Sequence, residues 1–240
     1  MEFVRGDSFP FKTLVTYLNG NPIKREDIQI EVSYLPSFNL AGDMYYWHKI
    51  SDNRYAVILL DMMGHGISAS LVCMFISSVL REAIKQLVEP ELVIKELNRY
   101  MVLIHNEKVG IPYYFTAVYM VVDTDQKTIE YVNAGHPPGF ALIDDEKVVP
   151  ISKSRCAVGF FDEIEVKKEV ITYEKDIQIV LYTDGVLEGM GPDEIESEKQ
   201  IEILTSKKWD HSHALIDNLL PKEKQQDQPD DMCVLMIQCK

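Results

Sequence analysis

The sequence predicts an α+β fold in which antiparallel β-sheets are covered by helices. Runs of alternating apolar and polar residues are joined by short turns, whereas helical periodicity is confined to separate blocks. Successive strands lack the interleaved helices that a parallel, Rossmann-type sheet requires. A chain of 240 residues is long enough for one sizeable core. We therefore expect one domain over residues 28–240, preceded by a leader or linker remnant at 1–27.

The first expected strand alternates Ile28, Ile30 and Val32 with polar residues, and Pro36 ends it. The third is the apolar run that stops at Asp61. Turn clusters such as Asn53 and Asp144-Asp145 separate the others. The expected strands cover residues 28–34, 44–47, 56–60, 115–122, 128–132, 140–143, 147–151, 163–172, 177–183 and 232–239.

Helical periodicity begins at Ile67, where apolar residues recur three and four positions apart up to Val88. Pro90 ends this helix and suits the first position of the next, which continues to about His105. Two further helices are expected at 194–207 and 211–220.

The formal net charge is −14, from 24 basic and 38 acidic residues. Such a surface repels phosphate backbones and anionic lipids, so partners of these kinds are not expected. A phosphorylated substrate would also be repelled unless cations lie in the site.

The sequence shows neither a secretory signal nor an apolar run close to the ~20 residues of a membrane span. Its four cysteines are scattered without a CxxC pair, which favours free thiols in a reducing compartment. We therefore expect a cytoplasmic protein without a membrane span. The oligomeric state stays open, a homodimer included.

Several aspartates stand at the ends of predicted strands. Asp61 and Asp184 directly follow apolar strands, Asp43 follows Gly42, and Asp230-Asp231 precede the last strand. If these strands are neighbours, their carboxylates converge and need protons or cations. Oxygen ligands alone select Mg²⁺ or Mn²⁺. Asp also favours turns for its own hydrogen bonds, so spacing alone leaves a metal site and ordinary turns equally open.

Other polar residues have simpler interpretations. His65 and His136 suit a tight turn and a Pro-bounded corner better than acid catalysis. Ser68 and Ser70 lack a Gly-x-Ser-x-Gly elbow and are better explained as small residues on a helix face. His211-x-His213 has no further Cys or His to complete a zinc site nearby.

Six short segments, taken in order, resemble one family. They are Ala41-Gly42-Asp43, Asp61-Met62-Met63-Gly64-His65-Gly66, Phe115-Thr116, Asn133-Ala134-Gly135-His136-Pro137-Pro138, Leu181-Tyr182-Thr183-Asp184-Gly185-Val186 and Asp230-Asp231. Their order resembles the metal-dependent, PPM-type protein serine/threonine phosphatases, in the bacterial branch typified by SpoIIE and RsbU. The resemblance runs from about residue 28 to the C-terminus. It implies two stacked antiparallel sheets flanked by helix pairs.

The resemblance also implies a site. Asp61 would bridge two Mn²⁺ or Mg²⁺ ions that activate water, with the Met62 carbonyl on one of them. Asp184 and Asp230 would complete the first metal, Asp43 would serve the second, and Asp231 would stand beside them. The implied substrate is a phosphorylated anti-anti-sigma (STAS-type) protein in a stress or sporulation partner-switching pathway. An upstream sensor domain or an activator protein is a possible further partner.

Two positions depart from the family pattern. Tyr46 stands where an Asp is common, and Cys233 stands where Thr is common. They leave a competing hypothesis, a catalytically impaired phosphatase-like module that binds the same kind of partner. A two-metal nuclease or phosphodiesterase is a weaker alternative because of the charge of −14. No phosphate-binding Arg can be assigned.

Overall fold

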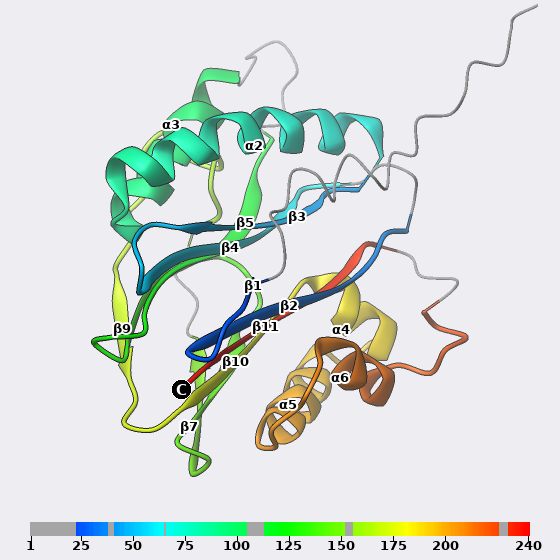
Figure 1. Ribbon diagram of the computed structural model, residues 1–240. Helices are drawn as coiled ribbons and strands as arrows, with labels where there is room; N and C mark the ends of the chain where they lie inside the picture. The colour runs from blue at the N-terminus through cyan, green and yellow to red at the C-terminus, as the bar shows by residue number, and fades with distance from the viewer. Residues whose placement is uncertain (1–22, 38–40, 65, 105–112, 152–155, 226–229) are drawn as a thin grey trace, which may run out of the picture.

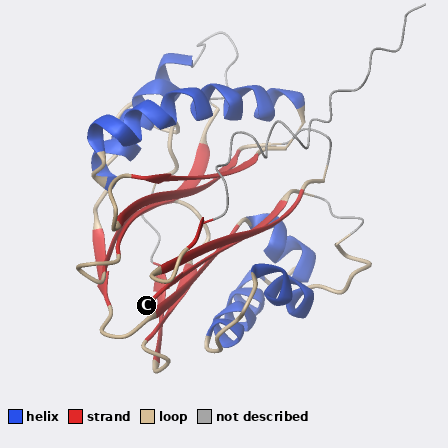
Figure 2. Ribbon diagram, viewed as in Figure 1, coloured by secondary structure: helices blue, strands red, loops and turns tan. Residues whose placement is uncertain are grey.

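The computed structural model describes residues 23–37, 41–64, 66–104, 113–151, 156–225 and 230–240. Two antiparallel sheets are stacked, with helices on both outer faces (Figures 1 and 2). The six-stranded sheet A has the order β1-β2-β11-β10-β7-β8, and the five-stranded sheet B has the order β3-β4-β5-β6-β9. The expected α+β fold is therefore confirmed.

Sheet A contains β1 (Ile23–Lys24), β2 (Ile28–Leu35), β7 (Gly139–Ile143), β8 (Lys147–Ile151), β10 (Ile177–Tyr182) and β11 (Met232–Cys239). Sheet B contains β3 (Asp43–Lys49), β4 (Arg54–Met62), β5 (Phe115–Asp123), β6 (Thr128–Ala134) and β9 (Glu169–Thr172). The helices are α2 (Ile67–Leu87), α3 (Pro90–Ile104), α4 (Asp184–Met190), α5 (Glu194–Thr205) and α6 (Ser212–Leu219). In Figure 1, α2 and α3 cover sheet B, while α4, α5 and α6 lie against sheet A.

Most elements begin and end close to their predicted bounds, but the strand expected at 163–172 is wrong over its first half. Only Glu169–Thr172 is a strand, paired with β6. Ile164 and Val166 are nevertheless buried between exposed residues and pack into the core under α3. An extended segment that buries alternate residues has the sequence pattern of a strand even where it forms no ladder.

Two short elements were not predicted. The strand β1 pairs with β2, with Ile23 opposite Ile30. The helix α4 follows β10 directly and contains Gly185 and Gly189, residues that weaken a helix of only seven residues. Sheet A therefore carries three helices where the resemblance implies a pair.

The helix α2 corrects one expectation from the sequence. It has 21 residues, and its most apolar 18-residue stretch has a mean hydropathy of 1.6, so by length and composition it could cross a membrane; it is the one such helix in the described ranges. In the structure its buried residues, Ile76, Leu80 and Ile84 among them, pack against sheet B. The same helix also leaves Ile67, Leu71 and Met74 exposed.

The alternation along β4 separates two cores. Ala56, Ile58 and Leu60 face α2 and α3. Val57 and Leu59 face the other way, into the layer between the two sheets. A third cluster lies between sheet A and helices α4 to α6. The same alternation continues to the strand ends, so the face toward which a side chain points there can be read from its position along the strand.

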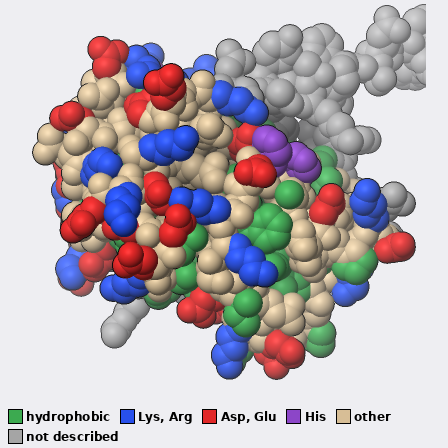
Figure 3. Space-filling model, turned by 60° about the horizontal axis from the view of Figure 1, so that its bottom comes forward, with side chains coloured by type: hydrophobic (Ala, Val, Ile, Leu, Met, Phe, Trp, Pro, Cys, Tyr) green, Lys and Arg blue, Asp and Glu red, His purple; other side chains and the backbone are tan. Residues whose placement is uncertain are grey.

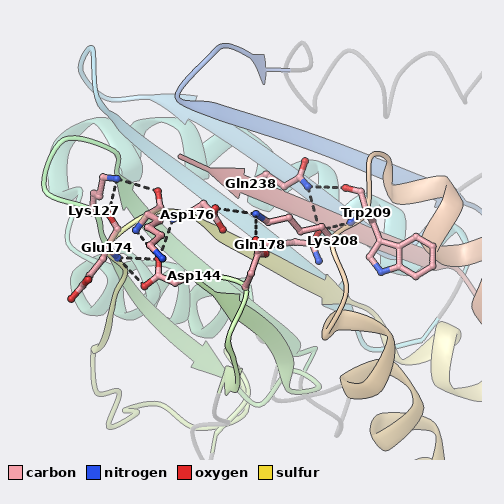
Figure 4. Close-up of polar contacts among 10 residues, drawn as sticks. Lys127, Asp144, Glu174, Asp176, Gln178, Lys208, Trp209 and Gln238 are labelled. Atoms are coloured by element: carbon pink, nitrogen blue, oxygen red, sulfur yellow. Dashed lines mark hydrogen bonds and ion pairs between the residues drawn. The ribbon is translucent and has the colours of Figure 1, made fainter.

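Near the C-terminus, polar groups are paired with one another on the helix-facing side of sheet A (Figure 4). Gln178 and Gln238 lie on that side because Ile179 and Ile237, one position away from them, face the inter-sheet layer. Gln178 Oε1 accepts hydrogen bonds from Trp209 N at 2.8 Å and from Gln238 Nε2 at 3.2 Å. On the face drawn in Figure 3, basic and acidic side chains are interspersed. The carboxylates singled out in the sequence lie at the opposite end of the layer.

Leu59 tests the importance of this layer, because it is fully buried on a central strand between the sheets. We expect Leu59→Ala to lower the free energy of unfolding by about 2–5 kcal/mol, through lost burial and the remaining cavity. Val170→Ala, at a side chain that is 53% exposed on β9, is the control and should change it by less than about 1 kcal/mol. Urea denaturation measures both, and equal effects would contradict the assignment of the core.

Candidate metal centre

Three polar residues form a row across the end of sheet B. In the ladder, Asp43 on β3 lies opposite Asp61 on β4, and Asp61 lies opposite Thr116 on β5. Residues paired in this way point to the same face of a sheet. Because Leu59 lies two positions before Asp61 and faces sheet A, the whole row faces sheet A as well.

Sheet A brings a matching set to the same place. Thr183 follows β10 and continues the alternation of Ile179 and Leu181, which face the inter-sheet layer. Asp184 begins α4, and Asp230 and Asp231 directly precede β11. The Thr183 hydroxyl donates to Asp43 Oδ2 at 2.7 Å, which joins the two sheets at this point.

The carboxylates repel one another. Burial and the charges of Asp184 and Asp230 together raise the pKa of Asp61 to about 8, against a hydrogen bond with Asp43 that lowers it. Burial and the charge of Asp61 also raise the pKa of Asp43 well above its usual range. Four of the predicted residues, Asp43, Asp61, Asp184 and Asp230, are therefore close enough to act on one another.

An aspartate at the other end of the sandwich shows the opposite behaviour. Asp144 accepts hydrogen bonds from the backbone N–H groups of Glu174, Lys175 and Asp176 (Figure 4). The bond from Lys175 N is the largest of the effects that lower its pKa. Asp144 is thus an ordinary turn aspartate, whereas Asp61 lacks comparable compensation.

In the described ranges, no three His, Cys, Asp or Glu side chains are arranged as a ready-made metal site. The raised pKa of Asp61 shows only that the carboxylates lie close together. To bind a metal ion, their oxygens must also point to one centre. The donor set, all oxygen and acidic, fits hard divalent cations in its chemistry.

Asp231 has a structural role that the sequence did not specify. Its Oδ1 accepts hydrogen bonds from Ser37 N at 2.7 Å and Ser37 Oγ at 2.9 Å, and its Oδ2 accepts one from Gly42 N at 2.7 Å. The side chain is only 3% exposed. Three donors satisfy this buried carboxylate, so Asp231 fixes the segment before Asp43 rather than adding a free oxygen to the cluster.

The helix α2 holds the same segment from the other side. Ser70 Oγ donates to the carbonyl of Ala41 at 3.0 Å and to that of Gly66 at 2.8 Å. Cys73 Sγ donates to the carbonyl of Gly42 at 2.8 Å. The expectation that Ser70 is structural agrees with these bonds, while His65 lies outside the described residues.

Tyr46 explains the first departure from the family pattern. It belongs to the core that faces α2, on the side of β3 opposite to Asp43, and its ring lies 5.4 Å from the Arg81 guanidinium. An aspartate at position 46 would therefore point away from Asp61. Cys233, the second departure, is fully buried in the inter-sheet core.

The backbone around Met62 is packed closely. Its side chain is buried toward α2, and its carbonyl lies 3.3 Å from where a Cβ on Gly42 would be. At Gly185 an added Cβ would overlap the carbonyl oxygen of Asp231. Glycine at position 185 thus allows the start of α4, with Asp184, to approach the start of β11, with Asp230.

His211 and His213 lie elsewhere. The rings of His211 and His213 are stacked 5.2 Å apart, and His211 Nδ1 lies 3.1 Å from Glu31. One further acidic residue belongs near the cluster: burial and the charges of Asp184 and Asp230 raise the pKa of Glu188. Sequence reasoning missed Glu188, and only its position one helical turn after Asp184 hints at this proximity.

Gly185→Ala tests the close approach of α4 and β11. We expect the substitution to lower the free energy of unfolding by about 1–3 kcal/mol, because the new methyl group must displace the Asp231 backbone. Gly191→Ala is the matched control, since a Cβ there meets nothing within 4 Å. Thermal unfolding compares the two, and equal stability of both variants would contradict the described packing.

The charge repulsion predicts how stability depends on pH in the absence of divalent cations. Asp61 has a pKa of about 8 in the folded protein, against 3.8 in a model peptide, so its proton stabilises the fold below pH 8. Stability should fall as pH rises from 6 to 8, by up to about 1.4 kcal/mol per pH unit. Unfolding temperatures in EDTA measure it. Asp61→Asn should flatten this slope and raise the unfolding temperature at pH 8, and a steeper slope would contradict the arrangement.

Comparison with known proteins identifies the family of the chain. Residues 51–240 match the family model described as Stage II sporulation protein E (SpoIIE). Over 167 residues the chain is 35% identical to Phosphoserine phosphatase RsbP of Bacillus subtilis (strain 168), covering 70% of this chain and 41% of RsbP. The chain spans about half the length of the curated relatives it matches, or less.

Two solved structures share the fold. The SiaA-PP2C domain of Pseudomonas aeruginosa aligns with a TM-score of 0.74 and 19% identity, covering 88% of this chain and 86% of that one. RsbX in complex with magnesium aligns with a TM-score of 0.68 and 17% identity, covering 92% and 99%. The architecture is thus that of PP2C domains, and the chain belongs to the SpoIIE family.

Proposed function

We propose that the chain is a metal-dependent protein phosphatase domain that hydrolyses phosphoserine or phosphothreonine on a protein substrate. One observation carries the proposal: Asp61 is half-buried beside Asp43, Asp184 and Asp230, and its pKa is raised to about 8. Concentrated negative charge of this kind is costly unless cations neutralise it. Membership of the SpoIIE family and the name of RsbP, a phosphoserine phosphatase, support the same activity.

Two divalent cations, Mg²⁺ or Mn²⁺, complete the proposed site. The residues that would hold them are Asp61 as the shared ligand, Asp184, Asp230, Asp43 and the Met62 carbonyl. Bound divalent cations lower the pKa of water and neutralise charge on phosphoryl oxygens. Support comes from the all-oxygen donor set and from the fold shared with RsbX, which was solved in complex with magnesium.

The chain's own groups keep these oxygens in position. Asp231 and Thr183 fix the backbone at Gly42 and the carboxylate of Asp43. Ser70 is committed to backbone carbonyls, which leaves it unsuited to act as a nucleophile. The proposed mechanism therefore uses water and no covalent intermediate. The proposed cations would also explain how a chain with a net charge of −14 can bind a negatively charged phosphate group.

The substrate is proposed to be a phosphorylated anti-anti-sigma protein of the STAS type, within a bacterial partner-switching pathway. The catalytic domain would include β1 (Ile23–Lys24), which pairs with β2, so it would begin before the expected boundary at residue 28 and extend to residue 240. The residues before β1 would be a leader or the remnant of a linker. An upstream sensor domain or an activator protein would regulate it. A cytoplasmic location belongs to this proposal, in agreement with four free cysteines.

Asp61→Asn tests the activity. We expect release of phosphate from a phosphoserine protein in Mn²⁺ to fall by more than the roughly 100-fold that loss of an outer-shell partner of a metal ligand typically costs. EDTA should abolish the activity of the unmodified protein, and added Mn²⁺ should restore it. A malachite green assay measures the released phosphate.

Asp125→Asn, at an exposed hairpin turn on sheet B, is the control and should retain full activity. Full activity of Asp61→Asn, or of the unmodified protein in EDTA, would refute the proposal. An unmodified protein that binds its phosphoprotein but releases no phosphate in Mn²⁺ would favour the impaired binding module.

A further inference from the structure

Thr116 is the third residue of the row that contains Asp43 and Asp61. It lies directly opposite Asp61 in the β4–β5 ladder and faces the same end of the inter-sheet layer. Side chains paired in this way have Cβ atoms about 4.5–5.5 Å apart. The Thr116 hydroxyl therefore lies beside the carboxylate at the centre of the proposed site.

A buried histidine holds this hydroxyl. Thr116 Oγ1 and His136 Nδ1 are 2.8 Å apart, and His136 is fully buried, whereas Thr116 is partly exposed. The pair thus has one member anchored inside the protein and one member at the open end of the layer.

The corner that carries His136 is itself fixed. His136 N donates to Asn133 Oδ1 at 2.9 Å, and Asn133 Nδ2 donates to the Ile151 carbonyl at 3.2 Å. On the other side, Tyr182 Oη donates to the Pro138 carbonyl at 2.7 Å. Since Tyr182 stands two residues before Asp184, the corner is tied to both halves of the site.

A comparison of two hydroxyls favours Thr116 as a donor to substrate. The Thr183 hydroxyl donates to Asp43 Oδ2 and accepts from Cys233 N, so its proton serves the fold. Thr116, by contrast, shares a hydrogen bond with a histidine nitrogen, which can act as donor or as acceptor.

We propose that the Thr116 hydroxyl donates a hydrogen bond to a phosphoryl oxygen of the substrate, and that His136 is the positioning residue that aims it. This inference rests on the proposed phosphatase function. Phosphoryl oxygens only accept hydrogen bonds, so the hydroxyl proton goes to the substrate and Oγ1 accepts from His136 Nδ1–H. The pair thereby supplies a donor in a site whose other described side chains are mostly carboxylates.

The experiment compares Thr116→Val with Thr116→Ser in the full chain with Mn²⁺. A hydrogen bond to a charged group contributes enough free energy that its removal lowers kcat/KM at least about tenfold. We expect Thr116→Val to lower kcat/KM for p-nitrophenyl phosphate by that factor and to weaken binding of inorganic phosphate in calorimetry. Thr116→Ser should retain both, and the Mn²⁺ affinity of both variants should stay within about twofold of the unmodified protein.

His136 is tested through its conservative variant. An asparagine amide can reproduce the donor at Nδ1, so His136→Asn should retain phosphate binding that His136→Ala loses. His136→Ala combined with Thr116→Val should be no worse than Thr116→Val alone, because the two residues act as one unit. Thr172→Val, the same change at an exposed position on β9, is the control and should leave every value unchanged.

Unchanged phosphate affinity and kcat/KM in Thr116→Val would overturn the inference while leaving the phosphatase function intact. A parallel loss of Mn²⁺ affinity would also overturn it, since Thr116 would then support the metal rather than the substrate. If the unmodified protein binds phosphate but hydrolyses nothing, the proposed function fails, and the phosphate affinities still decide the role of Thr116.

Discussion

A carboxylate can be buried only when a proton, a hydrogen-bond donor or a cation compensates its charge, and this requirement organises one end of the molecule. Asp231 is compensated by the donors of Ser37 and Gly42. Asp43 accepts a hydrogen bond from the Thr183 hydroxyl. Asp61 lies beside further carboxylates, whose charges together with burial raise its pKa. The cluster thus contains Asp231, which builds the fold, and carboxylates with fewer donors.

The arrangement follows from the pleat of the two sheets. Side chains alternate between the faces of β4, so the row that begins with Val57 and Leu59 in the apolar layer must end with Asp61. By the same rule, Thr183 on sheet A faces the inter-sheet layer because Leu181, two residues before it, does. Hydrophobic packing therefore orients the polar row, and a shift of register by one residue would turn that row toward α2.

Much of this could be predicted from the sequence. The apolar alternation gave the strands, and the run ending at Asp61 marked the position of the site. The sequence could not assign Asp231, because its three donors come from residues more than 180 positions away. Tyr46 faces α2 because it lies an odd number of residues after Asp43 along β3, and the sequence does not show which face of that strand is which. The extended segment before Glu169 shows that residues can be buried alternately without belonging to a paired strand. How the carboxylates orient around cations likewise depends on more than their place in the sequence.

The bond between Asp231 and Gly42 joins residues 189 positions apart, and that between Thr183 and Asp43 spans 140. Neither sheet alone gathers the carboxylates, and a partly folded chain keeps them dispersed. The proposed cation affinity would therefore be a property of the completed tertiary structure, and divalent ions bound there would stabilise the native state selectively. Because bound cations would relieve the repulsion between the carboxylates, the fraction of folded molecules would rise with cation concentration.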